Sequence, residues 1–206
     1  MSVLRSDLAR PAHEVALTLL GARLTHTTSA GAVTVEITEV EAYSGAMDPA
    51  SHAHRGRTAR NEVMFGEAGH LYVYLSYGMH WCANIVTGAP GHASGVLLRA
   101  GLVVEGIDLA RERRGSAVPD RNLARGPACL TQALGIDIAL SAADVLAGPP
   151  LTLESGRDVD APSIATGPRV GVRQAADVPW RFWIAHDPTV STYKRNPRAE
   201  PPAPHP

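Results

Sequence analysis

Two glutamates stand two residues apart in a segment typical of a β-strand. The sequence AVTVEITEVE alternates with period two, which places Glu39 and Glu41 on the face that Val33, Val35 and Ile37 occupy. If this face points inward, Glu41 loses water, and desolvation makes a carboxylate a stronger base near neutral pH. The alternative is a strand end open to solvent, where both acids are ordinary surface charges.

A polar loop rich in His and Arg, DPASHAHRGRTARN, follows at 48–61. The spacing of His52 and His54, with Asp48 nearby, could hold a metal, but no HExxH or CxxC pattern supplies further ligands. We therefore predict no metal site. The loop is better suited to contacts with phosphate, or else it is a solvated charged loop. The side chains that could make these contacts are Arg55, Arg57, Thr58, Arg60 and Asn61.

The segment LYVYLSYGMHWCANIV predicts a β-hairpin with its turn at 76–79. Tyr72 and Tyr74 share a face of the first strand and could stack on a base. Tyr77 and Met79 stand at the turn, where apolar side chains are a plausible wedge between stacked bases. The alternative is a tip packed under another loop. Six of the ten aromatic residues lie between positions 43 and 81, which favours one aromatic-lined site.

One cation interrupts an apolar strand, Arg99 in GVLLRA. A buried charge needs a partner, and Glu39 and Glu41 are the obvious candidates. An exposed position at a sheet edge is the alternative.

These residues must be positioned by a mixture of helices and strands in one domain, residues 1–195. The tail, 196–206, has five prolines and is expected to be disordered. We predict an α+β fold with a mainly antiparallel sheet. Helices are expected over 11–24, 104–114, 127–134 and from Ser141, and strands over 32–41, 71–75, 80–87, 95–100, 151–154, 169–173 and 181–185.

Composition excludes several classes of protein. The chain has 206 residues, 45% of them hydrophobic, and no apolar run of the roughly 18 residues that span a bilayer. Its first residues, MSVLRSDLARP, do not read as a signal peptide, and Cys82 and Cys129 are too few for a disulfide framework. We expect a cytoplasmic protein with no membrane partner. The net charge of −1 means that a nucleic acid must be held by a local basic patch.

Together these segments resemble the alkyladenine (3-methyladenine) DNA glycosylase family in its compact bacterial form. The resemblance covers roughly 8–194 and rests on ALTLLGARL, EVEAYSGAMDPASHAHRGRTARNEVMF, GHLYVYLSYGMHWCANIVTG, GVLLRAG, ARGPACLTQALGI and RVGVR…PWRFWI. It implies a single compact domain with a curved antiparallel sheet, flanking helices and a protruding hairpin that inserts into DNA. It also implies a monomer, associated with the nucleoid of a bacterium, that binds damaged duplex DNA in the minor groove.

The resemblance also implies the reaction. Family members flip the damaged purine into a pocket and hydrolyse its N-glycosidic bond with water, without a cofactor. Glu41 is similar in position to the general base that activates the water. Arg99 and the carbonyl of Val170 correspond to groups that help to position that water. Lys194 lies near the tail and no Lys falls in these motifs, so we expect no strand cleavage.

By the same resemblance, four residues surround the flipped base. Tyr43, His52 and Tyr74 correspond to its stacking walls, and electron-rich rings favour cationic alkylated purines. Asn84 corresponds to an Asn that disfavours the exocyclic amine of normal guanine. Such a set predicts selection of alkylated or deaminated purines.

At the hairpin, Tyr77 corresponds to the intercalating residue, with Met79 beside it against the DNA. Two departures from the family pattern, His80 and Ala59, affect the loop's grip on phosphate and the choice of lesion more than the chemistry. Two other hypotheses stay open. One is a non-catalytic binder of damaged DNA that uses the hairpin wedge, and the other is an enzyme that hydrolyses free nucleosides.

Overall fold

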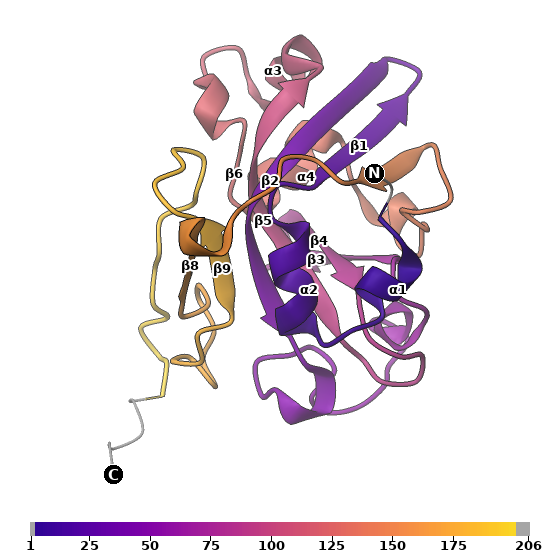
Figure 1. Ribbon diagram of the computed structural model, residues 1–206, viewed down its shortest axis with the longest axis vertical. Coiled ribbons are helices and arrows are strands. Elements are labelled where there is room, and N and C mark those ends of the chain that lie inside the picture. Colours follow the sequence, from indigo (N-terminus) through magenta and orange to yellow (C-terminus); the bar gives the residue numbers. More distant parts are fainter. Residues whose placement is uncertain (1–2, 201–206) are drawn as a thin grey trace.

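The strand that carries both glutamates, β2 (Gly31–Tyr43), is the longest in the sheet (Figure 1). The computed structural model describes residues 3–200. Val33, Val35 and Ile37 are completely buried, as expected for β-branched residues on a packed strand face. The predicted strand over 32–41 is confirmed, and it continues to Tyr43.

β2 forms the centre of a 9-stranded sheet in which each strand pair is antiparallel. The main path runs β3-β4-β5-β2-β1-β7, while β6 pairs with β5, and β9 pairs with both β2 and β8. The predicted α+β class with a mainly antiparallel sheet is confirmed. The other strands are β1 (Arg23–Thr28), β3 (Leu71–Ser76), β4 (His80–Val86), β5 (Gly95–Glu105), β6 (Ala124–Arg125), β7 (Leu151–Glu154), β8 (Ile164–Gly167) and β9 (Arg181–Ile184).

Four short α-helices flank this sheet (Figure 1). α2 (Ala12–Leu19) packs on β2 and β5, and α1 (Arg5–Leu8) precedes it. α4 (Pro127–Leu134) contacts β4, β5 and β6, and α3 (Ile107–Arg114) packs on α4. Within residues 3–200, no helix has the length and apolar character needed to cross a membrane. The remaining helical turns are 3₁₀, at Gly45–Met47, Glu62–Phe65, Asp120–Asn122, Ile138–Leu140 and Ala161–Ser163.

The first predicted helix is too long. It ends at Leu19, and the last residues of the predicted range, 23–24, belong to β1. The cause is Gly21, whose φ of 79° turns the chain, and where a Cβ would lie only 2.1 Å from the carbonyl oxygen of Arg157. An apolar helical pattern therefore stops where the backbone must approach a distant loop.

Two other helix predictions also need correction. The helix expected over 104–114 starts at Ile107, because β5 runs on to Glu105 and Gly106 (φ 71°) makes the turn. No helix starts at Ser141. Instead the amides of Ala142 and Val145 donate to the carbonyls of Leu71 and Gly69, so this segment lies beside β3.

The strand predicted over 169–173 is wrong, since these residues form bends. Gly171 has a φ of 72°, and the side chain of Arg169 is drawn into a buried ion pair. β1, β6 and β8 were not expected. In contrast, the hairpin of β3 and β4, helix α4 and strands β7 and β9 confirm their predicted ranges to within a residue.

Candidate active site

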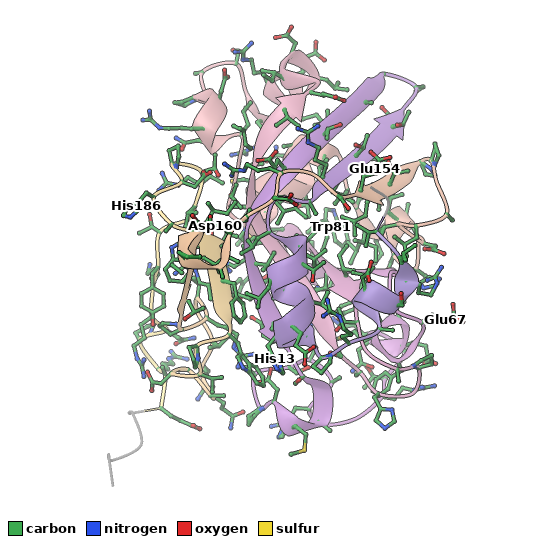
Figure 2. The ribbon with its side chains drawn as sticks, in the orientation of Figure 1. His13, Glu67, Trp81, Glu154, Asp160 and His186 are labelled. Atoms are coloured by element: carbon green, nitrogen blue, oxygen red, sulfur yellow. The ribbon has the colours of Figure 1, made fainter. Side chains whose placement is uncertain are left out.

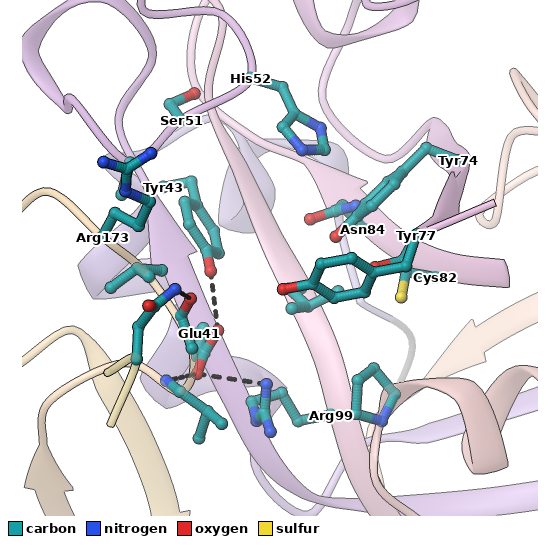
Figure 3. A pocket seen from close by; sticks show the side chains of 18 of the residues that line it. Glu41, Tyr43, Ser51, His52, Tyr74, Tyr77, Cys82, Asn84, Arg99 and Arg173 are labelled. Atoms are coloured by element: carbon teal, nitrogen blue, oxygen red, sulfur yellow. Dashed lines mark hydrogen bonds and ion pairs between the residues drawn. The ribbon is translucent and has the colours of Figure 1, made fainter. Parts of the chain in front are cut away.

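A cavity of about 730 Å³ opens where the end of β2 meets the β3–β4 hairpin (Figure 3). Glu41 lies at its inner end, and the aromatic rings of Tyr43, Tyr74 and Tyr77 stand around it (Figure 3). The lining joins segments from 41 to 197 in the sequence. All the predicted catalytic and base-binding residues therefore meet in one place.

A β-bulge directs the two glutamates toward this side of the sheet. The pairing of β2 with β5 shifts register between Ile37 and Glu39 and again before Val40. After the bulge, Val40 and Ala42 continue the apolar core that Ile37 belongs to, and the glutamates take the other face. The predicted shared face with the valines is thus wrong. The predicted desolvation is confirmed, since Glu39 and Glu41 are both 0% exposed.

Three groups hold the Glu41 carboxylate. The hydroxyl of Tyr43 donates to Oε2 at 2.8 Å, and the backbone amide of Val170 donates to Oε1 at 2.7 Å. The Nη1 of Arg99 lies 3.3 Å from the same Oε1 (Figure 3). Val170 makes this contact through its amide, while the resemblance assigns its carbonyl to the water, a role that stays a prediction. These donors fix the orientation of the carboxylate inside the cavity.

Glu39 is the hub of the ion pairs behind Glu41. It accepts from Arg99 Nε at 2.9 Å and from Arg181 Nε at 2.6 Å, and the Ser191 amide donates to its second oxygen. Burial would raise the pKa of Glu39, but Arg99 and Arg181 together hold that pKa below its ordinary value. Glu39 or Glu41 was the predicted partner of Arg99, and the structure pairs it with both. Arg99 is thereby locked beside Glu41.

Aromatic rings form one wall of the cavity. Tyr72 and Tyr74 stack with centroids 5.5 Å apart, and His52 meets Tyr74 edge-on at 4.5 Å. Burial raises the pKa of Tyr74 and, together with the Glu41 charge, that of Tyr43, so both phenols stay neutral. Desolvation and then the Arg60 charge lower the pKa of His52. The wall is therefore uncharged at neutral pH.

Asn84 lies in β4, in the lining of the cavity beside Tyr74 (Figure 3). Its side-chain amide Nδ2 donates to the carbonyl of Tyr72 at 3.3 Å. This bond holds the Asn84 amide in one orientation at the wall. A base entering the cavity would meet a fixed polar group there.

The hairpin tip is exposed, as the wedge hypothesis requires. Tyr77 is 85% exposed and Met79 is 70% exposed. Tyr77 and Gly78 have φ values of 50° and 69°, and a side chain in this left-handed region is unfavourable by roughly 1–2 kcal/mol. Such turns favour Asn-Gly or Asp-Gly. The strain indicates that Tyr77 is kept for something other than stability.

Residues 55–60 of the predicted phosphate-binding loop are exposed, and some of their side chains already have partners within the protein. The prediction for Asn61 is wrong, because its side chain is buried and donates to the carbonyls of His52 and Gly56. Arg57 pairs with Glu62 at 3.0 Å and lies over the ring of Phe65, and Arg60 donates to the carbonyl of Leu75. Thr58 closes a turn by donating its amide to the Asn61 side chain. Arg60 lines the cavity, whereas Arg55, Arg57 and Thr58 do not.

Asp48, considered from the sequence as a metal ligand together with His52 and His54, instead forms an ion pair. Asp48 is buried and binds Arg169, with Oδ2–Nη1 at 2.6 Å and Oδ1–Nη2 at 2.9 Å. Arg169 also donates to the Ala42 carbonyl and lies 4.6 Å from the ring centre of Tyr43. In the described part of the chain, no three His, Cys, Asp or Glu side chains gather closely enough to hold a metal ion.

The Asp48–Arg169 pair was not expected, because its partners are 121 residues apart and no local pattern links them. The pair continues into a stack of the Arg169 guanidinium and two aromatic rings. The Arg169 guanidinium also lies over Trp180, whose ring is parallel to that of His13 at 6.1 Å. His13 lies in the first turn of α2 and is labelled beside that helix in Figure 2. Arg169 thereby anchors Val170 against Glu41.

The sequence assigned no site role to two further parts of the cavity lining. Cys82 lies beside Tyr74 in the wall, and burial raises the pKa of its thiol. Residues 194–197, expected at the margin of a tail, also line the cavity. The position of Cys82 opposite Tyr74 follows from the register of the hairpin that the sequence predicts. No spacing or composition signal marks residues 194–197, because their position depends on how the chain returns to the sheet. Residues 201–206 of the predicted tail lie outside the described residues.

Comparison with known proteins identifies close relatives. The family model for methylpurine-DNA glycosylase (MPG) matches residues 6–188. A protein of Streptomyces avermitilis is 55% identical over 92% of this chain and 91% of its own, and one of Nocardia farcinica is 53% identical over 88% and 86%. A third, from Corynebacterium glutamicum, is 47% identical over 93% and 88%. Each is named "Putative 3-methyladenine DNA glycosylase".

Proposed function

Because the chain belongs to the methylpurine-DNA glycosylase family, we propose that it is a DNA repair glycosylase. It binds duplex DNA through the minor groove, flips an alkylated or deaminated purine of the 3-methyladenine type into the cavity, and hydrolyses the N-glycosidic bond. The observation that carries the proposal is a fully buried carboxylate, Glu41, at the inner end of an aromatic cavity whose mouth bears an exposed Tyr77.

Glu41 acts as the general base. The bond between the sugar C1′ and the purine nitrogen breaks, the electron pair leaves with the base, and C1′ becomes oxocarbenium-like. Water then adds to C1′ while Glu41 accepts its proton, leaving an abasic site. Arg99 and the Val170 amide hold the carboxylate in place for this step. The Val170 carbonyl is proposed to orient the water.

The neutral aromatic wall favours a cationic base. Tyr43, His52 and Tyr74 present ring faces or edges to the cavity, and cation–π attraction is worth roughly 0.5–2 kcal/mol per ring. Alkylated purines that carry positive charge are therefore held better than normal purines, and they are better leaving groups. Asn84 adds a fixed polar group that disfavours the exocyclic amine of guanine.

Charge at the mouth supports a polyanionic substrate. The inner cations, Arg99 and Arg169, have carboxylate partners. By contrast, Arg60, Arg173 and Lys194 line the same cavity without an acidic partner within 4.0 Å in residues 3–200. These rim cations, with Arg55, Arg57 and Thr58 on the neighbouring loop, would contact the phosphates. Tyr77, with Met79 beside it, would fill the gap left by the flipped base.

We further propose that the enzyme is a monomer, needs no cofactor and does not cleave the strand. A lysine nucleophile is activated by desolvation in an apolar pocket, whereas Lys194 is exposed. Borohydride trapping on the abasic product should give no covalent adduct. A lysine-dependent adduct would show lyase activity.

The central test is release of free base from methylated duplex DNA, followed by chromatography in the presence of EDTA. Wild type should release 3-methyladenine, and Glu41→Gln should bind the same duplex without releasing it. Glu36→Gln, on the same strand and outside the cavity, is the matched control and should retain release.

Three results would contradict the proposal. Turnover by Glu41→Gln would remove Glu41 from the role of base. Salt-sensitive binding without release of methylated bases, hypoxanthine or ethenoadenine would favour a non-catalytic binder. Equal activity on a free nucleoside would favour a nucleoside hydrolase.

A further inference from the structure

Residues 194–197 make up part of the cavity lining, although they lie beyond the region that the family model matches, 6–188. We call this segment the strap. It crosses the bend at 170–174, the same bend that delivers the Val170 amide to Glu41. The strap is therefore placed to act on the carboxylate through its nearest backbone donor.

The strap holds Gly171 on both sides of that residue. The Gly171 amide donates to the Lys194 carbonyl at 3.0 Å, and the Asn196 side-chain amide donates to the Gly171 carbonyl at 2.7 Å. Gly171 directly follows Val170. The first bond restrains the peptide that joins Val170 to Gly171, and the second restrains the peptide after it. On the other side, Arg169 is fixed by Asp48. Val170 is thus clamped from both directions.

Further contacts hold the ends of the strap. Arg195 forms a two-point pair with Asp177 and donates to the Glu200 carbonyl at 2.9 Å. The Glu200 amide donates to the Arg173 carbonyl at 3.0 Å. The strap is consequently anchored along its length to the 170s.

The strap also carries the only lysine of the chain to the rim. Lys194 is exposed, and no carboxylate lies within 4.0 Å of it in the described residues. Arg173, whose carbonyl accepts from the Glu200 amide, also lines the cavity, on the side of Ser51 (Figure 3). Two cations without acidic partners therefore flank the entrance beside the strap.

We propose that the strap is a working part of the active site with two roles. Asn196 is a positioning residue that keeps the Val170 amide on Glu41, and Lys194 contacts a phosphate of the strand that carries the flipped nucleotide. This inference rests on the proposed glycosylase function. It predicts that the two residues affect different steps, Asn196 the chemistry and Lys194 the binding of DNA.

The first arm of the test concerns Asn196. Single-turnover base release is measured with excess enzyme for wild type, Asn196→Ala and Gly171→Ala. Asn196→Ala loses the amide donor. Gly171→Ala strains the backbone at this point, because a residue with a Cβ disfavours a φ of 72°. The added Cβ meets no atom within 4 Å, so the change acts through the backbone conformation and not through a clash. Both should lower the rate about tenfold to a hundredfold. Their affinity for DNA, measured in a Glu41→Gln background, should stay within about twofold of the reference.

The second arm concerns Lys194. Lys194→Gln should weaken DNA binding. The magnitude of the slope of the logarithm of the binding constant against the logarithm of the salt concentration should fall by about one unit. The single-turnover rate at saturating enzyme should be retained. Lys194→Arg should restore both affinity and slope. Arg198→Gln removes the same charge four residues further on, outside the cavity lining, and should leave the slope unchanged.

The outcomes separate the strap from the proposed function. If wild type releases base and the Asn196 and Gly171 variants match its rate, the positioning role is wrong. If Arg198→Gln lowers the slope as much as Lys194→Gln, the phosphate contact is wrong. If wild type releases no base from any lesion duplex, the proposed function fails and the strap inference fails with it.

Discussion

The buried pair of Asp48 and Arg169 offers the sharpest test of how this site is built. Both side chains are 0% exposed, and two charge-assisted hydrogen bonds of 2.6 and 2.9 Å join them. The Nε of Arg169 already has no partner among the described residues. Removing Asp48 would leave a buried guanidinium with only the Ala42 carbonyl and the rings of Tyr43 and Trp180.

The expected cost of Asp48→Ala follows from this geometry. A hydrogen bond to a charged group contributes about 1.5–3 kcal/mol, and breaking a buried ion pair by removing one partner costs about 3–5 kcal/mol. For a chain of this size, each kcal/mol lowers Tm by about 2–4 °C. Asp48→Ala should therefore lower Tm by roughly 6–20 °C.

The stability of Asp48→Ala is measured by urea and thermal unfolding, and two further variants serve as comparisons. Asp48→Ala combined with Arg169→Met removes the orphaned charge, so the double variant should be more stable than Asp48→Ala alone. Asp120→Ala breaks an exposed pair with Arg111 and should cost less than about 1 kcal/mol. A loss below about 1 kcal/mol for Asp48→Ala, or a double variant no more stable than Asp48→Ala, would refute the reasoning.

Three other outcomes follow from the same structure. Tyr77→Asn should preserve or raise Tm, because Asn suits the left-handed turn. The same variant should bind DNA more weakly by about 1–3 kcal/mol, because the exposed ring no longer stacks on bases. Unchanged affinity would show that Tyr77 is not the wedge. Arg60→Gln should move the NMR titration of His52 to higher pH, because the Arg60 charge lowers the pKa of His52; a midpoint that stays in place would contradict this. In the folded state the pKa of Glu39 lies below its ordinary value of 4.5. The stability that the Glu39 carboxylate contributes is therefore complete above pH 4.5 and is lost as the pH falls toward the folded pKa. Acid unfolding of Glu39→Gln should accordingly depend less on pH in this range than that of wild type.

Local patterns predicted the elements whose conformation is set by their own residues. β2 alternates, the hairpin has its turn at Tyr77-Gly78, and α4 starts at a proline and ends at Gly135 with φ 74°. The errors arise where distant segments decide. Gly21 turns because it approaches Arg157, and the bend at Gly171 follows from the buried Arg169. No periodicity in the sequence records these contacts.

The bulge in β2 shows the same limit within the site itself. Period-two alternation assigned Glu39 and Glu41 to the face of Val33, yet the register shifts at Glu39 move them to the cavity side. The prediction of desolvation nevertheless held, because β2 is covered on both faces at this point. The residues of the site were therefore identifiable from sequence motifs, while their orientation required the pairing of β2 with β5.

The arrangement of charges explains why one of two buried glutamates suits the role of base. Arg99 makes its shorter contact, 2.9 Å, with Glu39, which also takes Arg181, and stands 3.3 Å from Glu41. Glu39 thus pairs with two cations and also accepts from the Ser191 amide, whereas Glu41 shares one cation and is otherwise held by neutral donors. A carboxylate oriented in this way is placed to take the proton of a water and to face a positively charged sugar. The proposed division of roles between Glu39 and Glu41 therefore rests on their partners, since the two side chains are chemically identical and equally buried.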